Sequence, residues 1–216
     1  MALHYHVIPV TPFAQNCSIL WCDETQRAAV VDAGGDLDRI LAFVHANGLT
    51  VEKLLLTHGH IDHAGSAAAL ASQLGVDIEG PQAEDAFWLD QLPQQGQAFG
   101  FPHSAALTPQ RWLNDGDTVS IGKQTLRVIH CPGHTPGHVV FYSSEAGLLV
   151  AGDVLFQGSI GRTDFPRGDH RALLDAIHSK LFILPDDTTV ITGHGPFTTL
   201  GEEKRSNPFV MNAGYR

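Results

Sequence analysis

The run HGHIDH, which begins at residue 58, groups side chains of the types that bind divalent metal ions in proteins. In an extended loop, residues i and i+2 point to the same side, so His58 and His60 can bind one ion together. Asp62 and His63 stand directly before a predicted helix, in a position to reach a second ion. This spacing predicts a metal site in the loop, with ligands for more than one ion.

Three further residues of the same kind stand farther along the chain, each within a few residues of the end of a predicted strand. They are His134, Asp153 and His194. The strands before the four loops are predicted at residues 51–56, 125–129, 147–151 and 188–192. Ligands of open α/β folds gather outside the carboxyl ends of the strands, so we expect these loops to converge. Imidazole and carboxylate groups suit zinc, iron or manganese, and no cysteine belongs to the set.

A simpler interpretation exists for each part of this pattern. A lone His-x-His pair is compatible with two surface histidines, and a lone aspartate after a strand often serves only as a turn residue. Four such loops in one chain are hard to obtain by chance, which favours the metal site over the separate simpler interpretations.

The elements that would position these loops alternate between strands and helices, as in an α/β domain. Apolar residues at helical spacing predict helices at residues 36–47, 64–74 and 169–181. Short apolar runs predict further strands at residues 17–22, 28–31 and 138–143. Near the end of the chain, Thr199 and Glu202 form a capping-box pattern. The helix that follows is predicted to expose Glu202, Glu203, Lys204 and Arg205 to solvent.

Residues 81–114 form the least regular stretch, in which prolines alternate with phenylalanine and tryptophan. A stretch of this length in a compact domain is typical of a functional lid or of a segment with short helices. We interpret it as a partly helical insertion over one face of the domain. Whether the insertion contacts substrate or only covers the core is an open alternative at this point.

The composition restricts the class of protein. The 216 residues are 43% hydrophobic, which is enough for a sizeable core. The 23 acidic residues outnumber the 13 basic ones, and a net charge of −10 argues against nucleic-acid partners and anionic membrane surfaces. No apolar run approaches the ~20 residues of a membrane span, and the first residues lack the features of a secretory signal. We therefore expect a cytoplasmic globular protein.

The cysteines contribute little to the predicted chemistry. Three cysteines, an odd and small number, argue against a disulfide-stabilised scaffold. Cys17 and Cys22 fall at core positions of predicted strands. Cys131 stands close enough to His134 to be a reactive thiol, although a buried and inert thiol is the commoner case for an intracellular cysteine.

Four motifs together resemble the metallo-β-lactamase superfamily. These are THGHIDH at residues 57–63, HTPGH at 134–138, GD at 152–153 and GHG at 193–195. The resemblance extends from Asn16 to Phe209, and so covers nearly the whole chain. It implies an α/β fold, a four-layer αββα sandwich, in which residues 1–216 form one domain with a dinuclear metal site along one edge.

The resemblance also implies a role for each motif residue. The ligands of the first ion would be His58, His60 and His134. The ligands of the second ion would be Asp62, His63 and His194. Asp153 would bridge the two ions. Asp32 would support the ligands without binding metal, and His138 would either support them in the same way or line the substrate site. The implied cofactor is a pair of divalent ions, zinc in the first place, with iron or manganese as alternatives.

Particular residues narrow the choice of branch within the superfamily. Asp153 is unlike the cysteine ligand of true β-lactamases, which argues against antibiotic hydrolysis. His60 stands where the flavodiiron oxidoreductases have a glutamate, which argues against a redox diiron site. Thioester hydrolases of the glyoxalase II type share all four motifs, and short bacterial members resemble the segments GDVLFQGSIGRTDFPRGD and TGHGPFTTLGEEKRSNPF. Their likeness implies hydrolysis of a glutathione conjugate, S-lactoylglutathione, to lactate and glutathione.

The resemblance to glyoxalase II enzymes implies a mechanism, and this sequence also differs from the classical members in one respect. A hydroxide that bridges the two ions would attack the thioester, and Asp62 or Asp153 would take up the proton. Arg162 lies near a basic residue that contacts glutathione in classical members, and it is equally compatible with a structural pair with Asp164. Classical members add a C-terminal helical region for glutathione, and we expect no such region here, because the sequence ends 22 residues after His194.

A second branch provides the alternative function. Persulfide dioxygenases share most of the motifs, and their Gly-Arg-Thr-Asp-Phe run resembles residues 161–165. The likeness implies a mononuclear iron enzyme that acts on glutathione persulfide with three ligands, such as His58, His134 and Asp153. In both cases the expected partner is a small molecule, with no nucleic acid and no membrane.

Overall fold

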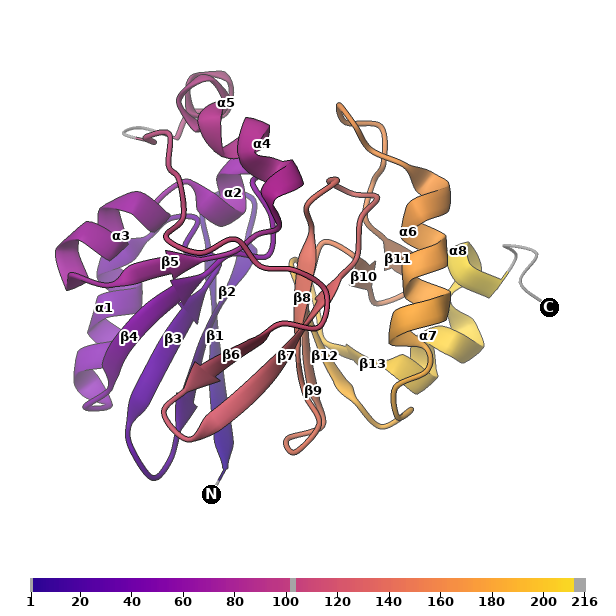
Figure 1. Cartoon of the computed structure of the whole chain (residues 1–216), viewed down its shortest axis with the longest axis horizontal. Coiled ribbons are helices and arrows are strands. Elements are labelled where there is room, and N and C mark those ends of the chain that lie inside the picture. Colours follow the sequence, from indigo (N-terminus) through magenta and orange to yellow (C-terminus); the bar gives the residue numbers. More distant parts are fainter. Residues whose placement is uncertain (1, 102–103, 212–216) are drawn as a thin grey trace.

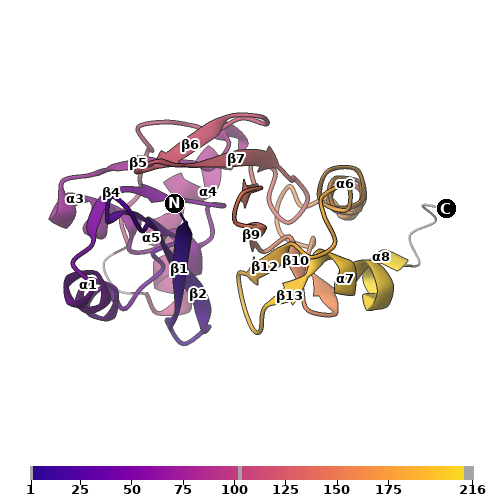
Figure 2. The same ribbon diagram turned by 90° about the horizontal axis from the view of Figure 1, so that it is seen from below.

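The computed structural model describes residues 2–101 and 104–211. Two β-sheets pack face to face, and helices cover the outer face of each sheet (Figures 1 and 2). The predicted four-layer αββα arrangement is therefore confirmed. Within the described residues, no helix combines the length and the apolar character that a membrane span requires.

The first sheet contains the N-terminal half of the chain in the order β1-β2-β3-β4-β5. Its strands are β1 (Leu3–Val10), β2 (Gln15–Cys22), β3 (Arg27–Val31), β4 (Thr50–Leu55) and β5 (Asp77–Glu79). The first three pair antiparallel, whereas β3, β4 and β5 pair parallel. Parallel neighbours need crossover connections, and helices supply them here. These helices are α1 (Leu37–Ala46), α2 (Ile61–Ala64) and α3 (Ala67–Leu74).

The second sheet has the order β13-β12-β9-β8-β7-β6. Its strands are β6 (Thr118–Ile121), β7 (Gln124–His130), β8 (Val139–Ser143), β9 (Leu148–Gly152), β12 (Thr189–Thr192) and β13 (Thr198–Thr199). The outer helices are α6 (His170–Ala176), a π-helical turn (Ile177–Leu181), α7 (Leu200–Ser206) and α8 (Pro208–Met211). A short hairpin of β10 (Leu155–Phe156) and β11 (Ser159–Ile160) follows β9.

The core between the sheets explains the apolar runs in the sequence. All five residues of β8 and all five of β9 are buried. Strands covered on both faces are continuously apolar rather than alternating. Leu20, Val31 and Leu55 of the first sheet pack in one cluster with Phe141 and Val150 of the second. This contact holds the two halves together along their length and leaves one edge free for the loops.

The insertion at residues 81–114 is partly helical in its described part, as predicted. It contains a 3₁₀ turn (Ala83–Asp85), α4 (Ala86–Asp90) and α5 (Leu92–Phe99). Both helices stand over the same edge of the sandwich (Figure 1). The predicted helix 64–74 is in fact interrupted, because α2 ends at Ala64 and α3 begins at Ala67, with Gly65 between them.

Two features of the fold differ from expectation. The sequence does not predict β1, because half of its residues are exposed and His4 and His6 weaken its apolar pattern. Those two imidazoles stack on Trp21 and Phe43, with ring centroids 5.5 and 4.1 Å apart. They therefore pack against the sheet and do not join the other histidines.

The prediction that Glu203 faces solvent is wrong. Its carboxylate is fully buried and accepts hydrogen bonds from the Thr198 hydroxyl at 2.5 Å, the Asn207 amide at 2.7 Å and the Gly158 N–H at 2.9 Å. The N-cap of the predicted capping box is confirmed, since Glu202 N–H donates to the Thr199 hydroxyl at 3.2 Å, while the Glu202 carboxylate accepts from Arg205 and Ser206. Through its bond to Gly158, Glu203 connects α7 to the hairpin that follows β9.

Candidate metal centre

The histidines and aspartates that follow the four strands converge at one edge of the sandwich. Their ligand atoms form groups of three that lie within 4.8 Å of one another, and two of these groups match the predicted ligand sets. The first is His58, His60 and His134. The second is Asp62, His63 and His194. The structure therefore brings together all the residues that the strand-end pattern singled out.

The first group is buried and consists only of imidazoles. His60 Nδ1 lies 2.9 Å from His134 Nε2, and the ring of His58 lies 4.8 Å from that of His60, centroid to centroid. The backbone of His60 is extended, and the ligand atoms of His58 and His60 lie within 4.8 Å of one another, as their spacing predicts.

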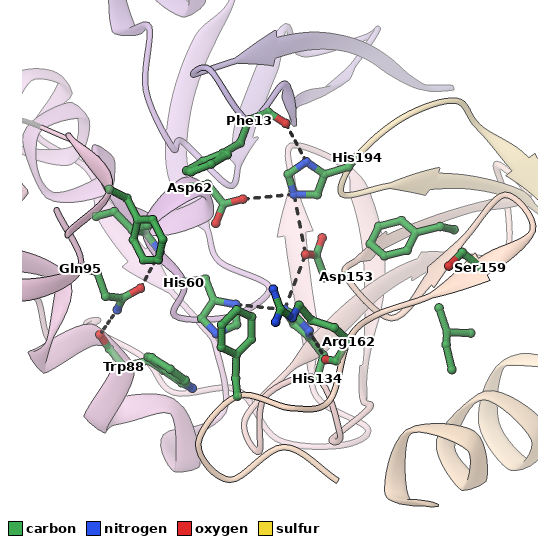
Figure 3. Close-up of a pocket in the computed structure, with 15 residues that line it drawn as sticks. Phe13, His60, Asp62, Trp88, Gln95, His134, Asp153, Ser159, Arg162 and His194 are labelled. Carbon is green, nitrogen blue, oxygen red and sulfur yellow. Dashed lines mark hydrogen bonds and ion pairs between the residues drawn. The ribbon is translucent and has the colours of Figure 1, made fainter. Parts of the chain in front are cut away.

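The second group lies nearer the surface, and Asp153 lies between the two groups. His194 Nε2 is 3.1 Å from Asp62 Oδ2 and 3.7 Å from Asp153 Oδ2 (Figure 3). On the other side, Asp153 Oδ2 is 3.5 Å from His134 Nε2, and Asp153 Oδ1 is 3.3 Å from His63 Nε2. One carboxylate is thus within reach of both sets of three residues.

Hydrogen bonds around the cluster orient the imidazoles. His134 Nδ1 lies 2.7 Å from the Arg162 carbonyl oxygen, and His194 Nδ1 lies 3.1 Å from that of Phe13. A carbonyl oxygen only accepts, so each Nδ1 donates, and each Nε2 faces the cluster beside the carboxylates of Asp153 and Asp62. An imidazole whose Nδ1 donates to a carbonyl binds a metal through Nε2.

The carboxylate of Asp32 contacts Thr57, directly before the HGHIDH run, and His63 at its end. Its Oδ1 accepts from Thr57 N–H at 2.8 Å, and its Oδ2 accepts from the Thr57 hydroxyl at 2.7 Å and lies 2.9 Å from His63 Nδ1. The Thr57 oxygen in turn lies 3.0 Å from His58 Nδ1. Asp32 therefore orients one imidazole of each group, directly for His63 and through Thr57 for His58.

His138 has a comparable contact with the backbone of Asp153. Its Nε2 accepts a hydrogen bond of 3.0 Å from Asp153 N–H. Gly152, at φ 48°, allows this approach, since a Cβ there would lie 2.7 Å from His138 Nε2. The backbone just before Asp153 is therefore fixed by a close contact that only glycine permits.

Several buried polar atoms at the centre of the cluster have no hydrogen-bond partner. They are His58 Nε2, His60 Nε2, His63 Nε2 and Asp153 Oδ1. Buried polar atoms are normally hydrogen-bonded, and an unpaired set that points to one place is explained by an ion. The donor set of imidazole and carboxylate fits zinc, iron or manganese.

The charges of the cluster also favour cation binding. Burial, reinforced by the surrounding imidazoles, holds the pKa of His58 well below its ordinary value, so this ring is neutral at neutral pH. Burial opposes ionisation of Asp153, but His63 and the other histidines outweigh it and lower its pKa. Burial alone would lower the pKa of His63, but Asp153, Asp62 and Asp32 outweigh it and raise that pKa, so a cation that binds His63 displaces its proton.

Asp85 is a residue of the site that sequence reasoning missed. It is fully buried in the 3₁₀ turn of the insertion, and it accepts from Gly59 N–H at 3.0 Å, the Thr135 hydroxyl at 2.8 Å and Gly137 N–H at 2.6 Å. It therefore ties the loop of His58 and His60 to the loop of His134. Its burial raises its pKa to about 6. The only sequence signal was an acidic residue in an aromatic segment, which does not distinguish it from Glu84 beside it.

A cavity of about 490 Å³ adjoins the cluster, and its wall includes His60, Asp62, His134, Asp153 and His194. Figure 3 shows His194 above Asp153, with Trp88 and Gln95 of the insertion at the opposite side. The insertion therefore contributes to the pocket as well as covering the core. The volume lies within the range of small-molecule sites in proteins.

Arg162 lies at this pocket, paired with a neighbour. Its Nε and Nη2 each donate a hydrogen bond of 2.6 Å to the Asp164 carboxylate, and its guanidinium lies 4.3 Å from the Phe165 ring centroid. The hydrogen bonds from Arg162 lower the pKa of Asp164 to about 2. Both sequence interpretations of Arg162 are thus compatible with its position. Cys131, in contrast, is completely buried, and burial raises its pKa to about 12.

Comparisons with known proteins agree with this geometry. A family model described as the metallo-beta-lactamase superfamily matches residues 10–194. The chain belongs to the metallo-β-lactamase superfamily. The matched range includes both ends of the candidate site, from His58 to His194.

Individual superfamily members show how similar this chain is to known proteins. It is 47% identical to hydroxyacylglutathione hydrolase GloC of Haemophilus influenzae, over 96% of this chain and 98% of the relative. The crystal structure of BLEG-1 B3 metallo-beta-lactamase superposes with a TM-score of 0.89 at 36% identity, covering 97% of this chain and all of that one. The crystal structure of TTHA1623 in a di-iron-bound form has a TM-score of 0.86 at 35% identity, covering 94% and 99%.

Proposed function

We propose that this superfamily member is a dinuclear metal-dependent hydrolase of glutathione thioesters, with S-lactoylglutathione as its test substrate. The observation that carries the proposal is the position of Asp153 between two complete groups of three ligands. The similarity to the Haemophilus influenzae enzyme over nearly the full length of both chains supports the same substrate class.

In this proposal, His58, His60 and His134 hold one ion and Asp62, His63 and His194 hold the other, with Asp153 shared between them. Zinc fits this donor set, and iron and manganese fit it as well. The ions, when bound, supply Lewis acidity, which lowers the pKa of water and polarises a carbonyl oxygen.

The chain itself contributes orientation and proton transfer. Hydrolysis adds water across the C–S bond: the acyl carbon gains a hydroxyl group, and the sulfur leaves as a thiol. Asp62 and Asp153 are the carboxylates among the described residues that line the pocket, so one of them receives the proton released from water. Asp32, His138 and Asp85 hold the surrounding loops in register for this step.

The rival function is oxidation of glutathione persulfide by a single iron. It requires three ligands and open coordination positions, and it gives no role to Asp62, His63 and His194. Those three side chains are close enough together to hold an ion of their own. The arrangement therefore favours hydrolysis.

A paired assay on one purified sample tests the proposal. The protein is stripped with a chelator, reloaded separately with zinc, manganese and ferrous iron, and given either S-lactoylglutathione or glutathione persulfide. Thioester hydrolysis that depends on reloading supports the proposal. Oxygen uptake with the persulfide and no thioester hydrolysis would contradict it and support the iron dioxygenase instead.

A further inference from the structure

The wall of the pocket beside the histidine–aspartate cluster is mostly apolar. It is built by side chains from separate parts of the chain, which are Phe13, Trp88, Phe99, Phe156, Ile160 and Phe165. Two of them are largely exposed to solvent, Phe13 by 45% and Phe99 by 55%. Exposed aromatic side chains that converge on one cavity indicate a binding surface rather than core packing.

The aromatic wall begins directly at the candidate ligands. The rings of Trp88 and Phe165 lie 4.6 and 4.9 Å from the ring of His60, centroid to centroid. On the opposite side, Phe156 lies 6.3 Å from His194. A substituent on a carbon atom that reacts at the cluster must therefore lie against aromatic rings.

Two polar side chains of this wall, Gln95 and Arg162, are engaged by neighbouring residues. Gln95 accepts from Ile61 N–H at 3.0 Å and donates to the Trp88 carbonyl at 2.9 Å. Arg162 is the one lysine or arginine among the described lining residues, and Asp164 engages it through two hydrogen bonds. A carboxylate of the substrate would therefore compete with Asp164 for the one lysine or arginine of the described wall.

The charges of glutathione fit poorly into such a wall. Transfer of a carboxylate from water to an apolar surface without a partner is strongly unfavourable. An apolar acyl substituent, in contrast, gains free energy in proportion to the area it buries. The wall consequently discriminates by the size and apolarity of the acyl group.

We infer that the pocket selects thioesters whose acyl group carries an aromatic or branched apolar substituent, and that the charged arms of glutathione stay in solvent. This inference rests on the proposed thioester hydrolysis and specifies its substrate class. The acyl carbonyl lies at the cluster, and its substituent lies against the aromatic wall, which includes Phe99, Phe156 and Phe165. The thiol half extends from the pocket into solvent.

Two substrate comparisons test the inference. S-Mandeloylglutathione differs from S-lactoylglutathione by a phenyl in place of a methyl group, and its kcat/KM is expected to be higher by about fivefold or more. S-Lactoyl-N-acetylcysteamine lacks the charges of glutathione, and its kcat/KM is expected to fall by less than about tenfold. A smaller ratio in the first comparison, or a larger loss in the second, overturns the inference.

A pair of variants assigns the preference to the wall. Phe99→Ala removes an exposed ring of the pocket, and it is expected to lower the mandeloyl-to-lactoyl ratio of kcat/KM by about threefold or more. Phe209→Ala removes a ring of similar exposure, 51%, outside the pocket, and should leave the ratio unchanged. An unchanged ratio in Phe99→Ala, or equal falls in both variants, would contradict the assignment.

The result also separates this inference from the proposed function. If the metal-loaded protein hydrolyses both glutathione thioesters but prefers lactoyl, only the inferred selectivity fails. If it hydrolyses none of the thioesters, the proposed function fails, and the selectivity fails with it.

Discussion

The carboxylate of Asp85 accepts a hydrogen bond of 2.8 Å from the hydroxyl of Thr135, the residue next to His134. The same carboxylate accepts from the N–H of Gly59, between His58 and His60. A buried acidic residue of the insertion thereby joins two ligand loops that come from different sheets. Positions of candidate metal ligands thus depend on a side chain that hydrogen-bonds to the residues beside them.

Asp85→Asn is expected to lower kcat/KM for the thioester by about tenfold or more, because an amide nitrogen cannot accept these hydrogen bonds. The variant should also release metal faster to a chelator, which is a readout independent of turnover. Asp90→Asn, an exposed change in the same segment, is the matched control and should retain both properties. Equal behaviour of the two variants would refute a positioning role for Asp85.

Asp32→Asn tests the support beneath His63. Asparagine tolerates the positive φ of 57° at this position, so the change mainly removes charge and one acceptor. Without the carboxylate 2.9 Å from His63 Nδ1, metal affinity is expected to fall by about 10–100-fold. Competition with a coloured chelator measures this, and the exposed Asp38→Asn serves as control. Unaltered affinity in Asp32→Asn would contradict the proposed support.

Cys131 provides a test of pH dependence. Burial raises its pKa from 9.0 to about 12, so between these values the unfolded chain releases the proton while the folded chain retains it. Stability should therefore fall as pH rises, by about 1 kcal/mol from this group at about pH 10. Urea unfolding at about pH 8 and about pH 10 should show a smaller fall in Cys131→Ala than in the unmodified protein.

The same thiol bears on mechanism. A buried, protonated thiol is a poor nucleophile, so Cys131→Ala is expected to keep thioester hydrolysis within about threefold. The native protein should not react with a thiol reagent until it is unfolded, because all three cysteines are buried. Rapid modification of Cys131 with loss of activity would show that the thiol takes part in the reaction.

Glu203 tests the support of the hairpin that carries Phe156. Glu203→Ala leaves the buried Asn207 amide and the Thr198 hydroxyl short of a partner, and unfolding free energy is expected to fall by about 2–3 kcal/mol. The exposed neighbour Glu202→Ala should change it by about 0.5 kcal/mol or less. Thermal or urea denaturation gives both values, and equal effects would contradict the buried network.

The sequence predicted which histidines and aspartates lie together at the edge of the sandwich, because these residue types form a local pattern. HGHIDH is a contiguous run, and strand-end loops of an α/β sheet converge for topological reasons. The sheets were predictable for a similar reason, since strands buried on both faces, such as β8 and β9, form apolar runs.

The supporting residues were not predictable in the same way, because their roles depend on contacts distant in sequence. Asp85 lies 50 residues from Thr135, and a buried acceptor there has the same local pattern as an exposed acid. Glu203 lies beside exposed charged residues in the sequence, and its contact with Gly158, 45 residues away, is not visible in that local pattern. β1 was missed because an edge strand needs few apolar residues.

The central claim, a thioester hydrolase with two ions that share Asp153, is tested most directly by metal titration. Metal-free protein is titrated with zinc, and with manganese in parallel, while the initial rate of S-lactoylglutathione hydrolysis is followed. The account predicts that the rate reaches its plateau at about two equivalents per chain. A plateau at one equivalent, with the second ion unbound in equilibrium dialysis, would contradict it.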